Sequence, residues 1–235
     1  IFDVNRKLTE KLLTDIEKSR ADRVEHLIRT KSRAMQLSGY QDPVSIDNQF
    51  VINGRYQREG YTVGKYAIEV GADYAIPVLL FVPDDNKEKY PAIIWLNPKG
   101  KLSDANPGGE IEKLVKKGYI VAAVDPLGIG EVKNTAAREH TESYTALLIG
   151  RSIPGIRASD IIRVADVLSR HEKVDPQKIA AVGIDDLCIP LIHAAAFNTL
   201  LSSLVLTGSP VSYRSIAMNR DYRIGFTSRE GGGYW

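Results

Sequence analysis

Residues 179–197 read IAAVGIDDLCIPLIHAAAF, and this stretch decides the fold. Residues 179–184 form an apolar run of the length expected for a buried strand. Asp185 and Asp186 interrupt the run, and residues 187–197 are then almost wholly apolar, which predicts a buried helix. A buried strand, a sharp turn and a buried helix are typical of a parallel sheet that carries helices on both faces.

The same alternation continues on either side of this stretch. Apolar runs predict further strands over residues 92–96, 119–124 and 204–207. Helical periodicity predicts helices over 109–117 and over 159–170, the second capped by Ser159. Residues 61–70 and 75–82 predict an antiparallel hairpin at a sheet edge, joined through Gly71. The predicted fold class is therefore α/β, a three-layer α/β/α sandwich with a mostly parallel sheet and an antiparallel edge hairpin.

The ends of the chain differ from this central pattern. Apolar residues recur at helical spacing near the N-terminus, so residues 1–59 are predicted to be a helical arm and lead-in, and residues 60–235 the α/β domain. The chain starts at Ile1 and stops at Trp235 soon after three glycines, and we expect the domain to be incomplete at its C-terminus. An open last strand should be covered by the arm, by residues 211–235, by another copy of the chain or by a neighbouring domain.

Composition excludes several classes of function. The 235 residues carry 31 basic and 29 acidic side chains spread along the chain, without the concentrated basic face that nucleic acids require. No apolar run is long enough to cross a membrane. The single cysteine, Cys188, excludes an internal disulfide and any multi-cysteine metal site. We expect neither a metal nor a cofactor.

Three loops follow the predicted strands at the sheet edge where ligands of α/β proteins gather. The first contains Asn97 and Lys99, the second begins at Asp125, and the third contains Asp185. Asn97 and Asp125 are the candidate substrate-binding residues. The second loop also contains Gly128-Ile129-Gly130, but Lys133 stands where a dinucleotide fingerprint needs its third glycine. The third loop is where a nucleophile elbow, G-x-S-x-G, would lie.

Several runs in the order of the chain resemble the acetyl xylan esterase-like branch of the α/β-hydrolases. Together they span about two thirds of the sequence, between Gly60 and Pro210. They are Gly60-Tyr61, residues 76–83 (IPVLLFVP), 90–96 (YPAIIWL), 124–130 (VDPLGIG), 155–163 (GIRASDIIR) and 174–183 (VDPQKIAAVG).

The resemblance implies an α/β-hydrolase fold and hydrolysis of an acylated carbohydrate or small ester. It also implies a secreted or periplasmic location. In such esterases an elbow serine attacks the ester carbonyl, and two backbone N–H groups bind the oxyanion. By position the nucleophile would be residue 185, and the donors would be Asp186 and Lys99.

This chain departs from the esterase pattern at several of these positions. Asp185 replaces the serine, Leu187 replaces the second glycine, and Asn97-Pro98 stands where His-Gly is usual. The resemblance also places an acid and a histidine on later strands, and no histidine of this chain lies there. The main hypothesis is a carbohydrate-esterase-type domain with impaired catalysis. The alternatives are an active hydrolase with Asp185 as an attacking carboxylate and a non-catalytic glycan-binding or structural module.

Other reactive side chains have simpler interpretations. His193 lies in an apolar helix and is predicted to be a core or helix-face residue, and His171 is predicted to be solvated. His140 with Glu139 and Glu142 is interpreted as a charged loop rather than a metal site. Cys188 is predicted to be a small core residue, and Ser209 has no elbow sequence around it.

Overall fold

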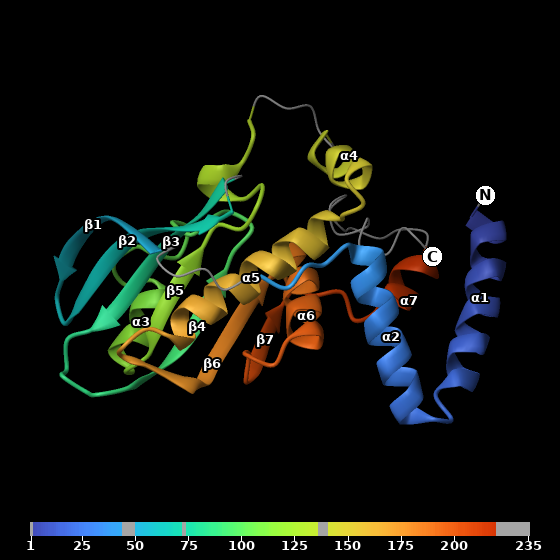
Figure 1. Ribbon diagram of the computed structural model, residues 1–235, viewed down its shortest axis with the longest axis horizontal. Helices are drawn as coiled ribbons and strands as arrows, with labels where there is room; N and C mark the ends of the chain where they lie inside the picture. The colour runs from blue at the N-terminus through green and yellow to red at the C-terminus, as the bar shows by residue number, and fades with distance from the viewer. Residues whose placement is uncertain (1, 44–49, 72–73, 136–140, 220–235) are drawn as a thin grey trace.

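The computed structural model describes residues 2–43, 50–71, 74–135 and 141–219 (Figure 1). Seven strands form one mixed sheet in the order β1-β2-β3-β5-β4-β6-β7. The strands are β1 (Phe50–Arg58), β2 (Tyr61–Val70), β3 (Tyr74–Pro83), β4 (Tyr90–Leu96), β5 (Ile120–Val124), β6 (Val174–Ile184) and β7 (Ser203–Thr207). The helices are α1 (Phe2–Ser19), α2 (Arg23–Ser38), α3 (Glu110–Lys116), α4 (Thr141–Leu148), α5 (Ile153–Ser169), α6 (Cys188–Phe197) and α7 (Tyr213–Ala217), with short 3₁₀ turns at Gly130–Val132 and Asp185–Leu187.

The sheet confirms the predicted α/β class. Strands β5, β4, β6 and β7 are mutually parallel, while β1, β2 and β3 pair antiparallel and β3 joins β5 antiparallel. The antiparallel part is one strand larger than predicted, because β1 extends the β2–β3 hairpin. The apolar pattern of β1 is weak, since Val51 and Ile52 are exposed and a bulge interrupts the register between Ile52 and Gly54. Periodicity therefore gave no signal for this strand.

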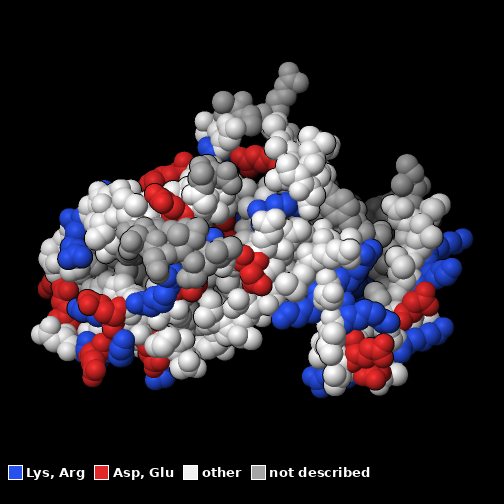
Figure 2. Space-filling view, in the orientation of Figure 1, with Lys and Arg blue, Asp and Glu red and all other residues white. Residues whose placement is uncertain are grey.

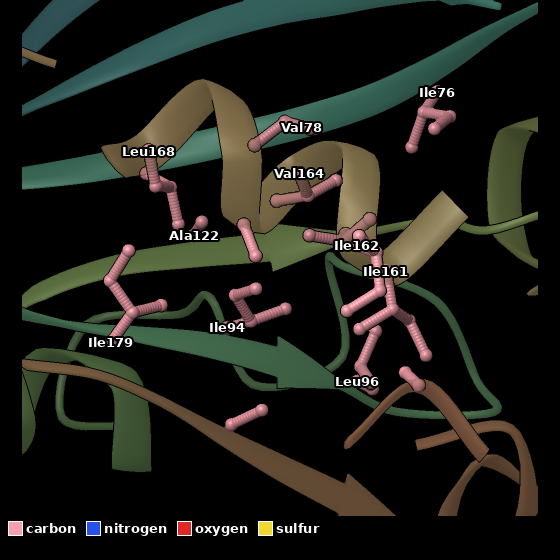
Figure 3. Packing of buried hydrophobic residues seen from close by; sticks show 14 of the residues in the cluster. Ile76, Val78, Ile94, Leu96, Ala122, Ile161, Ile162, Val164, Leu168 and Ile179 are labelled. Carbon is pink, nitrogen blue, oxygen red and sulfur yellow. The ribbon is translucent and has the colours of Figure 1, made fainter. Parts of the chain in front are cut away.

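The two faces of the sheet are covered by different helices, which confirms the three-layer prediction. The larger apolar cluster lies between the sheet and helices α5 and α6, and Figure 3 shows α5 side chains packed on those of the strands. Ile161, Val164 and Leu168 of α5 are almost completely buried there, with Ile94 and Ile179 from the sheet. On the opposite face, Ile111 and Val115 of α3 are buried in a second cluster.

Helix α5 begins earlier than the sequence analysis predicted, so Ser159 is not its N-cap. Ser152 caps the helix, and its hydroxyl accepts a hydrogen bond from the backbone N–H of Gly155 at 3.1 Å. The true signal is Ser152-Ile153-Pro154, because proline in the first turn has no N–H to leave unsatisfied. Ser159 lies inside the helix, where its hydroxyl donates to the carbonyl of Gln41 at 2.7 Å.

The predicted N-terminal helical arm is a pair of helices. Asp22 caps α2 by accepting from the N–H of Glu25 at 3.0 Å, and Gly39 ends α2 in the left-handed conformation. Ala34 and Met35 pack on the core beside α5 and α6, so the C-terminal half of α2 anchors the arm. Figure 1 shows α1 and α2 diverging from their connecting turn, away from the sheet.

Among the described strands, β7 is the last of the sheet and pairs with β6 alone. Val205 is 56% exposed and Leu206 is 39% exposed. The prediction that the chain covers this edge is therefore wrong for the arm and for residues 211–219. Residues 220–235 lie outside the described residues.

Candidate functional site

The carboxyl ends of four parallel strands lie side by side at one edge of the sheet. Strand β4 leads into the loop with Asn97 and Lys99, β5 into the loop that starts at Asp125, and β6 into Asp185 and Asp186. Because the order is β5-β4-β6-β7, the loop after β4 lies between the other two. The fold thus brings all five predicted site residues to the edge at which α/β proteins bind ligands.

Asp185 occupies a strained turn between β6 and α6. Its φ angle is +47°, and only Asn86 shares a positive φ among the described non-glycine residues. Such backbone strain costs roughly 1 to 3 kcal/mol and persists where surrounding structure imposes it. The carboxylate is exposed to solvent, and it lies so close to Gly208 that a Cβ there would overlap Oδ1 of Asp185. The turn therefore presents an acidic side chain where an elbow presents its nucleophile.

Cys188 begins helix α6 directly after this turn and is fully buried. Its Sγ lies 3.2 Å from the carbonyl oxygen of Gly183, to which the thiol donates. Burial raises the pKa of the Cys188 thiol, and the carboxylates of Asp185 and Asp186 raise it further. A thiol with a raised pKa is a poor nucleophile, so its geometry agrees with a core role.

The polar groups of the loop after β4 form hydrogen bonds with one another. Oδ1 of Asn97 accepts a hydrogen bond from the backbone N–H of Lys99 at 2.9 Å. Nδ2 of Asn97 donates to Asp104 at 2.7 Å, and the same Asp104 oxygen accepts from Nε1 of Trp95 at 2.8 Å. The Lys99 N–H, the predicted oxyanion donor, is therefore occupied by an amide from the same loop. The Lys99 side chain is exposed.

Asp125 joins the loops after β4 and β5. It is 1% exposed and accepts from the backbone N–H of Lys101 at 2.6 Å and of Glu131 at 3.0 Å. Its other contact is the buried ammonium of Lys101 at 2.9 Å, which also pairs with Glu131 at 2.8 Å. In this conformation Asp125 binds protein donors, and its role in binding substrate stays a prediction.

A second buried polar group supports the loop after β5. Nε of Arg157 donates to the carbonyl of Leu127 at 2.8 Å, and Asp160 accepts from the N–H of Leu127 at 3.0 Å. Tyr74 also donates its hydroxyl to Asp160. Burial raises the pKa of Asp160 to about 6. Burial lowers the pKa of Arg157, while the nearby carboxylates, including Asp186, raise it.

Sequence reasoning gave these two residues no role. They lie in the run of residues 155–163 that carried the resemblance. The available signal was the presence of Arg157 and Asp160 on one apolar helix, because charged side chains in a buried helix need partners.

The three described histidines lie away from the elbow. His193 stacks on Phe197 in α6, and burial lowers its pKa. His171 precedes the start of β6, at the other end of the sheet, and His26 contacts Ser19 in the arm. His140 and Glu139 lie outside the described residues. Within the described ranges, no three His, Cys, Asp or Glu residues are grouped to hold a metal ion.

Comparison with known proteins gives a fold and no sequence family. No family model and no curated protein matches this sequence. Among solved structures, a putative acetyl xylan esterase from Bacteroides fragilis is similar with a TM-score of 0.66 and 20% identity, covering 77% of this chain and 52% of that one. A glucuronoyl esterase from Solibacter usitatus gives a TM-score of 0.57 and 18% identity, covering 80% and 58%. Acetyl xylan esterase 1 from Thermoanaerobacterium sp. gives 0.56 and 14%, covering 77% and 57%.

These likenesses confirm the predicted fold. The chain shares the α/β-hydrolase fold of these solved structures. It spans a little over half the length of these three solved structures. No helix in the described part of the chain is long and apolar enough to cross a membrane.

Proposed function

We propose that this chain is a carbohydrate-esterase-type α/β-hydrolase domain that binds an acylated carbohydrate or small ester but is impaired in hydrolysing it. The observation that carries the proposal is Asp185, exposed and in the strained conformation at the end of β6. The position is that of a nucleophile elbow, yet the residue lacks the hydroxyl of a serine.

A carboxylate at this position opposes acyl transfer for an electrostatic reason. Attack on an ester carbonyl places negative charge on the carbonyl oxygen, and that charge is stabilised by N–H donors aimed at it. Asp185 and Asp186 instead bring negative charge to the turn. On the other side of the site, the N–H of Lys99 already donates to Asn97. Both expected oxyanion donors, the N–H groups of Asp186 and Lys99, are thus weakened. Asn97 would have to move before the N–H of Lys99 could bind an oxyanion.

The proposed ligand follows from the fold relatives and the polar groups of the loops. The similar structures are described as acetyl xylan and glucuronoyl esterases. The exposed carboxylate of Asp185 is a group that hydrogen-bonds sugar hydroxyls. We propose neither a metal nor a cofactor, and we propose a secreted or periplasmic location on the resemblance alone.

A second candidate is an active hydrolase in which Asp185 is the nucleophile. The positive φ of Asp185 supports it, because a nucleophile elbow also places its residue in a strained strand-to-helix turn. With an acyl ester, a carboxylate oxygen of Asp185 would attack the carbonyl carbon, form a mixed anhydride and release the alcohol or phenol. Hydrolysis of that anhydride needs a base to activate water. None of the three described histidines contacts Asp185, which favours the impaired domain.

Turnover of p-nitrophenyl acetate distinguishes the two candidates. We expect the chain to release p-nitrophenol no faster than the protein-free background, and Asp185→Asn to behave in the same way. Asp15→Asn, an exposed carboxylate on α1, is the matched control. Saturable turnover that Asp185→Asn abolishes and Asp15→Asn preserves would establish the active alternative.

Ligand binding tests the remaining part of the proposal. We expect acetylated xylo-oligosaccharides to bind in calorimetric titration, and Asp185→Ala to weaken the binding several-fold because a sugar-binding carboxylate is removed. Absence of both binding and turnover would leave only a structural role for the domain.

A further inference from the structure

A groove of about 890 Å³ lies between α1, α2 and α7, and the loops after β4, β5 and β6 do not line it. Helices α1 and α2 diverge from their turn at residues 20–22, and α1 packs on the short helix α7 rather than along α2 (Figure 1). The two helices therefore form a wedge that α7 fills in part.

The floor of the groove is apolar. Leu12, Leu13 and Ile16 of α1 line it together with Ile216 and Ala217 of α7. Leu12 is 50% exposed and Ile16 is 42% exposed. Full burial of a leucine or isoleucine side chain contributes about 1.5 to 3 kcal/mol of free energy. A ligand that covers the exposed parts of Leu12 and Ile16 would therefore gain binding free energy.

The rim of the groove is basic. Arg20, Arg29, Arg33 and Arg214 all line it, and no aspartate or glutamate of the described ranges does. Arg214 lies 3.7 Å from Glu17, whereas neither Arg20 nor Arg29 has an ion pair with a described residue. Figure 2 shows Lys and Arg side chains, interspersed with Asp and Glu, along the part of the surface formed by α1 and α2. The groove thus combines an apolar floor with guanidinium groups at its border.

We propose that this groove binds an acidic amphipathic helix of a partner protein. A wedge between two helices suits a third helix, whose apolar face lies on the floor while acidic side chains on its flanks meet the arginines. Acidic flanks are required because guanidinium groups pair strongly with carboxylates. A second copy of this chain is a poor occupant, because a symmetric contact would bring the same basic rims together.

A charge-exchange experiment tests the proposal. The probe is a fluorescent peptide of about 18 residues, roughly five helical turns, with leucine on one face and glutamate on both flanks. A matched peptide carries lysine in place of each glutamate. Binding is followed by fluorescence anisotropy against the full chain and against Arg29→Glu, Arg33→Glu and the double variant. Arg55→Glu is the control, since Arg55 is also exposed but lies on β1.

The expected result is saturable binding of the glutamate peptide to the wild-type chain. The Kd of the glutamate peptide should be at least about tenfold higher for the double variant, because reversed charges at the rim replace attraction with repulsion. Arg55→Glu should leave this Kd unchanged. The lysine peptide should bind the double variant more tightly than the wild type. Circular dichroism of each variant shows that the fold is intact. The proposal is overturned if the glutamate peptide does not bind, or if the two peptides bind equally well.

Discussion

At the scale of single residues, two carboxylates at this edge of the sheet have opposite environments. Asp185 is exposed in a strained turn, and Asp125 is buried with three donors from Lys101 and Glu131. An exposed carboxylate with a fixed backbone is available to a ligand, whereas a buried one with its donors supplied stabilises the loops. The same residue type is therefore exposed at one position and holds the loops together at the other.

Asp160 gives the stability of the fold a specific dependence on pH. Its pKa is raised from 3.8 to about 6 by burial, so the native state binds the proton more tightly than the unfolded chain. The contribution of Asp160 to the free energy of unfolding is therefore largest below pH 4 and is lost as pH rises to about 6. Two pKa units correspond to roughly 3 kcal/mol.

This contribution can be isolated by substitution. In Asp160→Asn the amide keeps a partner for the N–H of Leu127 and for Tyr74, but it does not titrate. We expect the difference in unfolding free energy between wild type and Asp160→Asn to change by roughly 3 kcal/mol between pH 4 and pH 7, measured by urea denaturation. A difference that stays flat with pH would show that Asp160 has an ordinary pKa in the native state.

At the scale of elements, loops rather than helices decide the form of the site. The loop after β4 is held to the loop after β5 by the ion pair of Lys101 and Asp125. Backbone groups contribute as well, because Asp125 also accepts from the N–H of Lys101 and of Glu131. Asn97 and Lys99 lie in the segment that these contacts hold.

Removal of the buried cation should destabilise the domain strongly. Lys101→Ala leaves the Asp125 carboxylate buried without its charge partner, which costs about 3 to 5 kcal/mol. We expect a correspondingly lower midpoint of thermal unfolding. Lys113→Ala removes an exposed lysine of α3 that pairs with Glu110, and it should change stability by less than about 1 kcal/mol. Similar effects of both substitutions would contradict a stabilising role for the buried ion pair of Lys101 and Asp125.

At the scale of the whole molecule, the described residues leave apolar surface exposed in two places, the groove of the arm and strand β7. The apolar residues that line the groove of the arm are partly exposed. Strand β7 is an edge strand, which pairs with β6 alone among the described strands. Leu204 packs on the core, while Val205 and Leu206 are exposed, so β7 has apolar residues on both faces. A strand of this kind pairs readily with another strand.

Self-association through β7 should therefore depend on protein concentration. We expect sedimentation velocity to show larger species as concentration rises, and Val205→Lys to suppress them because a charged edge strand resists pairing. Val51→Lys, on the opposite edge strand β1, is the matched control and should have a smaller effect. A wild-type chain that stays monomeric over the whole range would contradict this prediction.

The sequence alone determined the class of the fold and the residue at the elbow. Both depend on local patterns. Apolar runs such as residues 179–184 specify buried strands, and the residue type at position 185 shows that a serine hydroxyl is absent there. The start of α5 is also encoded locally, by Ser152 as the N-cap and Pro154 in the first turn.

Only the tertiary structure decided how the site residues are used. The partner of Asp125 is the ammonium of Lys101, 24 positions away, and Arg157 meets Leu127 across 30 positions. Strand β1 and the open edge at β7 likewise depend on what packs beside them. Periodicity reports which side of an element is apolar, whereas hydrogen-bond partners and exposed edges are set by the packing of elements far apart in the chain.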